Sequence, residues 1–198
     1  MRNRTSWAVV ASLAIAVAGI SYHTAASKTG DEKSTASHAM ESKVTMAVAM
    51  VEGLGEHKVK GKVTFTQKGD GLEIKGEFTG LQPGQHGFHI HEFGDCSMAD
   101  GKCAGGHFNP NGGKHSSPDD PKRHAGDLGN LKADSTGNAS FEMVDKMLSL
   151  SGENSVIGRS VIIHAKADDL KTQPSGDSGD RIGCGVIGIA DPKVQGMH

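Results

Sequence analysis

The sequence predicts an all-β fold in which about eight short antiparallel strands form a sandwich or barrel. From Val44 onward, apolar and polar residues alternate with a period of two, which is the signature of half-buried strands. The 198 residues include 28 glycines and only 4 % aromatics, which fits short strands joined by many turns. No segment has a convincing amphipathic helical pattern. The length suits one domain plus an appendage.

The clearest strands are residues 58–66 and 72–79. Valine, glycine and phenylalanine alternate with lysine and threonine in the first, and Leu72, Ile74 and Phe78 alternate with charged residues in the second. The Gly-Asp-Gly at 69–71 between them is a hairpin signal. Each strand therefore has one apolar and one polar face, as a half-buried antiparallel sheet requires.

Five further strands are expected at residues 45–51, 86–91, 138–144, 160–164 and 185–190. Met46 and Met50 lie at strand spacing in the first of these, and we interpret them as core side chains rather than copper ligands. Two long irregular segments, 92–127 and 165–183, interrupt the strands. Loops of this length are uncommon unless they are functional or disordered, so we expect two functional loops.

The N-terminus has the features of a secretory signal peptide. A basic Met-Arg-Asn-Arg precedes an apolar run at 7–20 and then small residues, which predicts a signal peptide over residues 1–26 with cleavage after Ala18 or Ala26. The alternative is an uncleaved membrane anchor, but a span needs about 20 apolar residues. The protein is therefore expected in the periplasm or cell envelope, with membrane contact only if this segment is retained.

Residues 27–43 are polar and aperiodic, and they predict a flexible linker. His38 and Met40 could collect copper there, but nothing near them completes a site, so we interpret them as ordinary linker residues. The net charge of −2 argues against nucleic acid as a partner, because that requires a basic face. Removing residues 1–26 removes two Arg and no acid, which leaves 19 basic and 23 acidic residues and a charge of −4.

Potential metal ligands are concentrated between residues 89 and 164. Imidazole suits copper and zinc, and three imidazoles with one carboxylate suit tetrahedral zinc. Alone, each histidine could be a hydrogen-bonded loop residue; together they predict two neighbouring metals. The set comprises His89, His91, His107, His115, His124, Asp127 and His164.

The spacing of these ligands indicates how they converge. His89 and His91 project from one face of a strand, whereas Phe88 and Ile90 point into apolar packing. His164 ends an apolar strand and can meet them, and His107 could serve either metal or bridge both. We expect His86 to have a structural hydrogen-bonding role.

Four motifs resemble copper–zinc superoxide dismutase of the bacterial, exported type. They are Gly-Phe-His-Ile-His-Glu-Phe-Gly-Asp at 87–95, Gly-Gly-His-Phe-Asn-Pro at 105–110, Arg-His-Ala-Gly-Asp-Leu-Gly-Asn at 123–130 and Arg-Ile-Gly-Cys-Gly-Val-Ile-Gly at 181–188. The resemblance covers a domain at 44–191, leaves a tail at 192–198 and implies an eight-stranded Greek-key topology.

The resemblance also implies a ligand set for each metal. Copper is expected on His89, His91, His107 and His164, and zinc on His107, His115, His124 and Asp127. The shared His107 would bridge the two metals as an imidazolate and would take up a proton when copper is reduced. The implied reaction is the disproportionation of superoxide to oxygen and hydrogen peroxide by Cu(II)/Cu(I) cycling.

Two further roles follow from the resemblance. Asp168 matches the aspartate that links a copper histidine to a zinc histidine, although a turn residue is the alternative. Arg181 matches the arginine that holds superoxide beside copper. The 17 residues from His164 to Arg181 are fewer than in the familiar eukaryotic enzymes, so steering residues are not transferred; Lys166 is either a contributor or a solvated lysine.

Three cysteines leave one unpaired if a disulfide forms. Cys184 matches the family's C-terminal half-cystine. Loop-closure entropy does not choose between Cys96 and Cys103 as its partner, because both loops predict about 4–5 kcal/mol of stabilisation. The bacterial family pattern favours Cys96, five residues after His91, and leaves Cys103 as the free thiol.

Two other functions compete with the enzyme. One is a non-catalytic copper-binding or copper-delivery protein on the same fold, which lost ligands or a lost arginine would favour. The other is a structural envelope protein with incidental metals, which would not require Asp168 or Arg181. The sequence leaves open whether the protein is a monomer or a homodimer.

Overall fold

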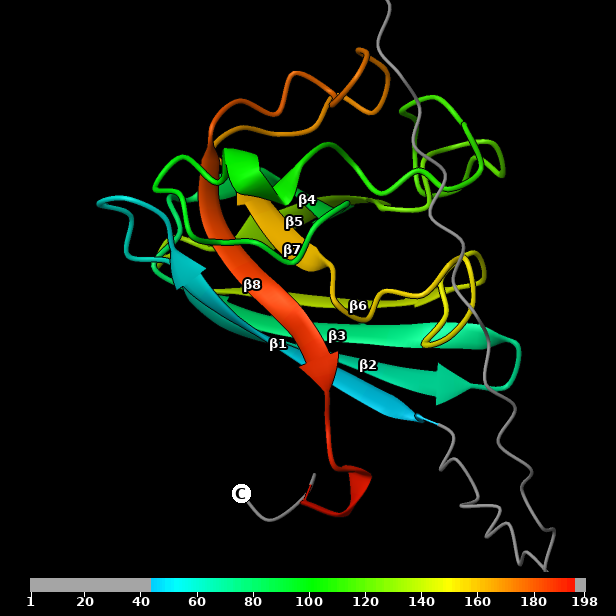
Figure 1. Ribbon diagram of the computed structural model, residues 1–198. Helices are drawn as coiled ribbons and strands as arrows, with labels where there is room; N and C mark the ends of the chain where they lie inside the picture. The colour runs from blue at the N-terminus through cyan, green and yellow to red at the C-terminus, as the bar shows by residue number, and fades with distance from the viewer. Residues whose placement is uncertain (1–43, 195–198) are drawn as a thin grey trace, which may run out of the picture. The chain divides into compact units, whose positions relative to one another are not determined.

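The computed structural model describes residues 44–194, which fold into eight antiparallel strands in a nearly closed barrel (Figure 1). The predicted signal peptide (1–26), the predicted linker (27–43) and residues 195–198 of the predicted tail lie outside the described residues. The elements are β1 (Met46–Gly53), β2 (Lys60–Lys68), β3 (Gly71–Thr79), β4 (Gly84–His91), β5 (Asp127–Ala133), β6 (Ala139–Asp145), β7 (Ser160–His164) and β8 (Arg181–Ile189), with 3-10 turns η1 (Lys102–Ala104) and η2 (Pro192–Val194). Within 44–194, no helix is long and apolar enough to cross a membrane.

The strands follow the order β5-β4-β7-β8-β1-β2-β3-β6, and every neighbouring pair is antiparallel. The terminal strands of this order, β5 and β6, approach each other and nearly close the barrel. In Figure 1, β1, β2, β3 and β6 form one layer, β4, β5 and β7 form the other, and the long β8 crosses between them. The predicted all-β fold is confirmed.

The hairpin between β2 and β3 follows the predicted pattern. Gly69 adopts a left-handed φ of 58° in the turn, a conformation that costs glycine little. Leu72, Ile74 and Phe78 all point inward and are buried, as their alternation with charged residues predicts. They belong to the single large core between the two layers.

The prediction that Met46 and Met50 fill the core was wrong. The inward face of β1 consists of Ala47, Ala49 and Val51, whereas Met50 is 60 % exposed and Met46 is only partly buried. Both faces of this strand carry apolar residues, so a period of two identifies a strand here without showing which face is buried.

One strand was not expected, and another begins earlier than expected. β5 starts at Asp127, where glycine and asparagine weaken the strand pattern, and β8 starts at Arg181 inside the segment predicted to be irregular. Both strands contain a register shift. The first shift lies between β4 and β5. Gly129 adopts a φ of 85° there, and the shift brings Asp127 opposite His89.

The second shift lies between β7 and β8 and brings His164 opposite Arg181. β-Bulges commonly re-aim side chains beside functional sites. These two irregularities therefore place four of the predicted site residues at one end of the barrel.

The loop after β4 is held by a disulfide and by apolar burial. Cys96 is bonded to Cys184 of β8, as predicted, and Cys103 is a free, partly buried thiol. Phe108 and Ala125 lie in the main core, so the loop also orders itself by hydrophobic burial rather than through metal ligands alone. In Figure 1, both long loops lie above β4, β5 and β7.

Candidate metal centre

Two sets of buried ligand atoms lie side by side in the described part of the chain. Within each set, the ligand atoms all lie within 4.8 Å of one another. One set consists of His89, His91, His107 and His164, and the other of His107, His115, His124 and Asp127. The structure therefore brings together all seven residues singled out in the sequence.

Four ring nitrogens in the first set are buried and have no hydrogen-bond partner among the described residues. They are His89 Nδ1, His91 Nε2, His107 Nε2 and His164 Nε2. Unpartnered polar atoms are costly in a protein interior, so a cluster of four calls for an explanation. A metal ion fits, because imidazole nitrogens ligate through the lone pair that these atoms keep free.

The other nitrogen of each of these rings is held in place. His91 Nδ1 lies 3.0 Å from the Gly105 carbonyl oxygen, and His164 Nδ1 lies 3.1 Å from that of Gly179. His89 Nε2 lies 2.8 Å from Asp168 Oδ2. A proton on the held nitrogen leaves the opposite one as a lone pair, which is how proteins orient metal-binding histidines.

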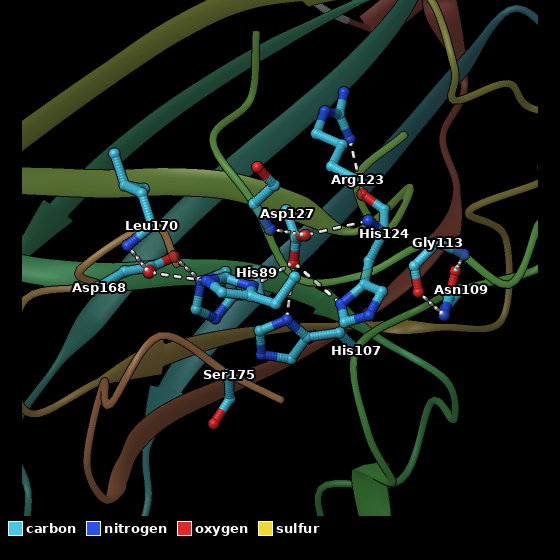
Figure 2. A network of polar contacts seen from close by, with 12 residues as sticks. His89, His107, Asn109, Gly113, Arg123, His124, Asp127, Asp168, Leu170 and Ser175 are labelled. Carbon is cyan, nitrogen blue, oxygen red and sulfur yellow. Dashed lines mark hydrogen bonds and ion pairs between the residues drawn. The ribbon is translucent and has the colours of Figure 1, made fainter. Parts of the chain in front are cut away.

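Asp127 is the centre of the second set (Figure 2). Its Oδ1 lies 2.7 Å from His107 Nδ1, 2.9 Å from His115 Nδ1 and 3.4 Å from His124 Nδ1. The backbone N–H groups of Ser116 and His124 donate to Oδ2 and fix the carboxylate. Three imidazoles around one carboxylate are the donors of a closed tetrahedral zinc site.

His107 belongs to both sets through different nitrogens. Its Nε2 is one of the unpartnered atoms of the first set, and its Nδ1 faces Asp127 in the second. One imidazole thus offers a different nitrogen to each set.

Asp168 joins the two sets from the side opposite His107. Its Oδ2 pairs with His89 Nε2 and its Oδ1 with His115 Nε2, both at 2.8 Å. Figure 2 shows Asp168 beside His89, with the backbone N–H of Leu170 donating to the same carboxylate. This is the geometry that a linking aspartate requires.

Burial keeps three histidines of the first set, His89, His91 and His164, neutral. It lowers the pKa of His89 to about 4 and that of His164 to about 3, and it holds the pKa of His91 well below its usual value. Neutral imidazole is the form that binds metal. At neutral pH these side chains are therefore ready to act as ligands.

The carboxylates of Asp127 and Asp168 shift the pKa of a histidine in the second set. Burial lowers the pKa of His115, but hydrogen bonds to Asp127 and Asp168 outweigh it and raise the value to about 9. Burial raises the pKa of Asp127, but its hydrogen bonds from His107 and His115 hold it well below the usual range. A metal binding here would displace the extra proton from His115.

A cavity of about 190 Å³ opens onto the first set. Arg181 is the only lysine, arginine or carboxylate side chain that lines it; the lining comprises His91, Gly106, His107, His164, Pro174, Ser175, Gly179 and Arg181. The Arg181 guanidinium donates to the carbonyl oxygens of Gly101 (2.6 Å) and Gly105 (2.7 Å). Because Gly105 also holds His91, the positive charge is fixed beside the metal ligands. The cavity suits a small anion.

Lys166, whose role the sequence left open, is exposed and does not line this cavity. His86 hydrogen-bonds through its two ring nitrogens to the carbonyl oxygens of His164 and Gln82, both at 2.8 Å, which fits the expected structural role.

Arg123 and Gln173 are among the residues that hold the loops and that sequence reasoning missed. Arg123 is buried and donates to the carbonyls of Pro118, His124 and Ala125 and to the carboxylate of Asp145. Gln173 exchanges hydrogen bonds with the backbone of His115, at 2.9 and 2.7 Å. An arginine directly before His124 was the only available signal; nothing in the sequence near Gln173 indicated its contact.

Comparison with known proteins identifies a family and a similar solved structure. The family model described as copper/zinc superoxide dismutase (SODC) matches residues 59–187. Among solved structures, the chain is similar to one titled "Crystal Structure Analysis of the clock protein EA4". The two are 40 % identical, the match covers 74 % of this chain and 95 % of that chain, and the TM-score is 0.68.

Proposed function

The chain belongs to the copper/zinc superoxide dismutase family, and from this we propose that it is an active, exported enzyme that disproportionates superoxide. The observation that carries the proposal is the set of four buried imidazole nitrogens without a partner among the described residues; three of the four rings line a cavity whose only full charge is Arg181. This arrangement combines a copper-type donor set with a place for a small anion.

The donor chemistry supports a proposed assignment of the two metals. His89, His91, His107 and His164 would hold copper, and His107, His115, His124 and Asp127 would hold zinc. When bound, copper supplies one-electron chemistry between Cu(II) and Cu(I), while zinc supplies structure and no redox step.

Three side chains of the protein, those of Arg181, His107 and Asp168, have separate roles in the proposed reaction. Arg181 attracts superoxide and orients it beside the copper ligands, and its two carbonyl bonds keep the guanidinium from moving. His107 lines the same cavity, and its Nε2 has no hydrogen-bond partner among the described residues, which supports a role in holding a proton and passing it to the reduced product. Asp168 keeps His89 and His115 in position.

The cellular location is part of the proposal. The disulfide fits an oxidising compartment, and the basic and apolar start of the sequence fits export to the periplasm or cell envelope. We therefore propose a signal peptide at 1–26, a linker at 27–43, a catalytic domain at 44–191 and a tail at 192–198.

A second candidate function is a non-catalytic copper protein. A solved relative is titled a clock protein, so membership of the family does not by itself establish turnover. Superoxide dismutation by residues 27–198, with copper and zinc measured in the same sample, separates the two functions. We expect fast, cyanide-sensitive turnover at about one copper and one zinc per chain. Full metal occupancy without turnover would favour copper binding or delivery.

A further inference from the structure

A second cavity, of about 820 Å³, lies beside the second ligand set (His107, His115, His124 and Asp127), which we call the zinc-type cluster. It shares no lining residue with the cavity that Arg181 lines, which we call the Arg181 cavity. Its walls come from two loops, 111–123 and 170–173, together with Met147. We call it the lysine cavity, because Lys114, Lys122 and Lys171 all line it. It therefore presents a cationic surface distinct from the Arg181 cavity.

Within the described part of the chain, the three lysines have no carboxylate partner. Among residues 44–194, none of their ammonium groups forms an ion pair within 4.0 Å, in contrast to Lys68, Lys75, Lys102 and Lys146. The one carboxylate in the lining, Asp120, accepts hydrogen bonds from the Ser116 hydroxyl and the Lys122 backbone N–H. The cavity thus carries three lysines against one acid, on a chain whose net charge is −2.

The fourth basic residue, Arg123, does not add to this excess. Its guanidinium is buried and bonded to three carbonyls and to the carboxylate of Asp145. It forms part of the floor of the cavity and leaves the lysines as the groups free to meet a ligand.

The cavity also has apolar walls. Met147 and Leu170 are both partly buried and line it together with Pro121. Sites for small organic molecules typically have volumes of about 300–1,000 Å³ and combine apolar walls with a few polar groups. These walls therefore suit a ligand with a negative end and an apolar end.

We propose that the lysine cavity binds a phosphate monoester of a compact apolar group. A phosphate dianion matches the net charge of +2 that the three lysines and Asp120 leave in the lining, and its oxygens accept hydrogen bonds from the ammonium groups. Three like charges around one cavity repel one another, and a bound dianion removes that cost. The apolar group packs against Met147 and Leu170.

The position of the cavity couples its occupant to the zinc-type cluster. The two walls meet where Gln173 exchanges hydrogen bonds with the backbone of His115, whose ring faces Asp127 and Asp168. Lys114 and Lys122 lie on one wall and Lys171 on the other. A ligand that contacts both walls holds them together, and it should slow the release of zinc by the linkage between binding and stability.

The test is an NMR titration of the copper(I)- and zinc-loaded protein with phenyl phosphate. We expect saturable shifts in the backbone amides of residues 112–122 and 170–173. Replacing the three lysines together (Lys114→Gln, Lys122→Gln, Lys171→Gln) should weaken binding by about tenfold, because three exposed charges each contribute modestly. The matched control, Lys58→Gln, Lys60→Gln, Lys62→Gln, makes the same change in charge on exposed residues at and beside β2 and should bind as the wild type does.

Two further arms identify the ligand class. Inorganic phosphate should bind more weakly than phenyl phosphate, because it cannot use the apolar wall. Vesicles containing phosphatidic acid, compared with phosphatidylcholine vesicles, distinguish a lipid headgroup from a soluble ester as the source of the phosphate. If phosphatidic acid vesicles capture the wild type but not the triple variant, the phosphate belongs to a lipid headgroup. If they do not capture the wild type, the ligand is a soluble ester.

Three results would overturn the proposal. They are the absence of saturable binding to the wild type, shifts centred on the Arg181 cavity instead, and equal affinities in the triple lysine variant and its control. Zinc release measured with a chelator gives an independent check: phenyl phosphate should slow it in the wild type and not in the triple variant.

Discussion

The side chain of Asn130 hydrogen-bonds to both backbone polar groups of Asp168, the N–H and the C=O. The Asn130 side-chain amide donates to the Asp168 carbonyl oxygen at 2.9 Å, and its Oδ1 accepts from the Asp168 N–H at 2.7 Å. Asn130 lies in β5, whereas Asp168 lies in the loop after β7. These two hydrogen bonds thus attach Asp168 to the barrel, and the Asp168 carboxylate contacts both His89 and His115.

Replacing Asn130 with alanine should loosen both the loop and the zinc-type cluster. Two hydrogen bonds are lost, so the free energy of unfolding should fall by about 1–3 kcal/mol. Zinc affinity should fall by about 10–100-fold, as happens when groups that orient metal ligands are removed. Chelator competition measures the second effect. Asn138→Ala is the control, because that exposed amide donates only to Thr136; an equal loss of zinc affinity in both variants would contradict the assigned role.

Replacing Arg181 with glutamate should slow dismutation while copper stays bound. The only full charge lining the cavity would change sign, and superoxide is an anion. A focused charge changes encounter rates by about 10–1,000-fold, so the loss should fall in that range and shrink at high ionic strength.

The matched control for this change is Lys193→Glu, which alters the net charge equally at an exposed position in η2 that does not line the cavity. A third variant, Arg181→Lys, keeps the charge but loses the fork that reaches the Gly101 and Gly105 carbonyls, and it should retain part of the rate. Unchanged turnover in Arg181→Glu, with copper content verified, would refute the role of Arg181.

Removing the disulfide should destabilise the chain strongly. The Cys96–Cys184 bond closes a separation of 88 residues, for which chain entropy predicts about 4–5 kcal/mol of stabilisation. Urea unfolding of Cys96→Ser should show a loss of this order. Cys103→Ser, which removes the free thiol, should leave the midpoint nearly unchanged; equal effects of the two changes would mean that Cys103 takes part in the native pairing.

Replacing Asp145 with asparagine should be costly, although this residue lies outside both metal-type clusters. The change leaves the buried Arg123 guanidinium without its compensating charge, and breaking a buried ion pair costs about 3–5 kcal/mol. Because Arg123 also donates to the His124 carbonyl, zinc affinity should fall as well. Asp134→Asn is the control, since Asp134 is exposed and accepts only turn hydrogen bonds; zinc affinity equal to wild type in Asp145→Asn would contradict the coupling.

Most of the fold could be predicted because its strands alternate clearly. β2 and β3 carry lysine, threonine or glutamate at every outward position, so their buried faces are unambiguous. β1 has methionine and valine on its outward face and alanine and valine on its inward face, and β5 contains Gly129 and Asn130, so their patterns carry little information. Tertiary contacts, and not local preference, decide these two strands.

The ligands of the candidate site could be predicted from residue type and spacing, but their supports could not. His89 and His91 share a strand face, and this alone implies a common target. The contacts from Gln173 to His115 and from Arg123 to Asp145 join residues 58 and 22 positions apart. Such pairs have no sequence signature, because only the folded loops bring them together.

The metal-free protein should be most stable near pH 6.5 and less stable on both sides. On the acid side, burial depresses the pKa of His89 to about 4 and of His164 to about 3, from an ordinary value of 6.5. As the pH falls from 6.5 toward 4, these two histidines therefore become protonated in the unfolded chain but stay neutral in the folded chain. Each group removes about 1.4 kcal/mol of stability per pH unit in that window.

On the alkaline side, the sign is reversed. The carboxylates around His115 raise its pKa to about 9, so its contribution is fully present below pH 6.5 and is lost as the pH rises to 9. Asp127 and Asp168 do not alter the acid arm above pH 4, because their depressed pKa values place their window below the ordinary aspartate value of 3.8. The maximum near pH 6.5 thus arises from histidines shifted in opposite directions.

Urea unfolding of the EDTA-treated protein at pH 5.0, 6.5 and 8.5 measures both arms. His164→Gln should flatten the acid arm by one histidine's share, whereas His57→Gln, which changes an exposed histidine, should leave the profile unaltered. A profile that rises steadily from pH 6.5 to 5.0 would show that the buried histidines accept protons in the folded state. That result would mean that the unpartnered nitrogens are not held as neutral lone pairs ready for a metal.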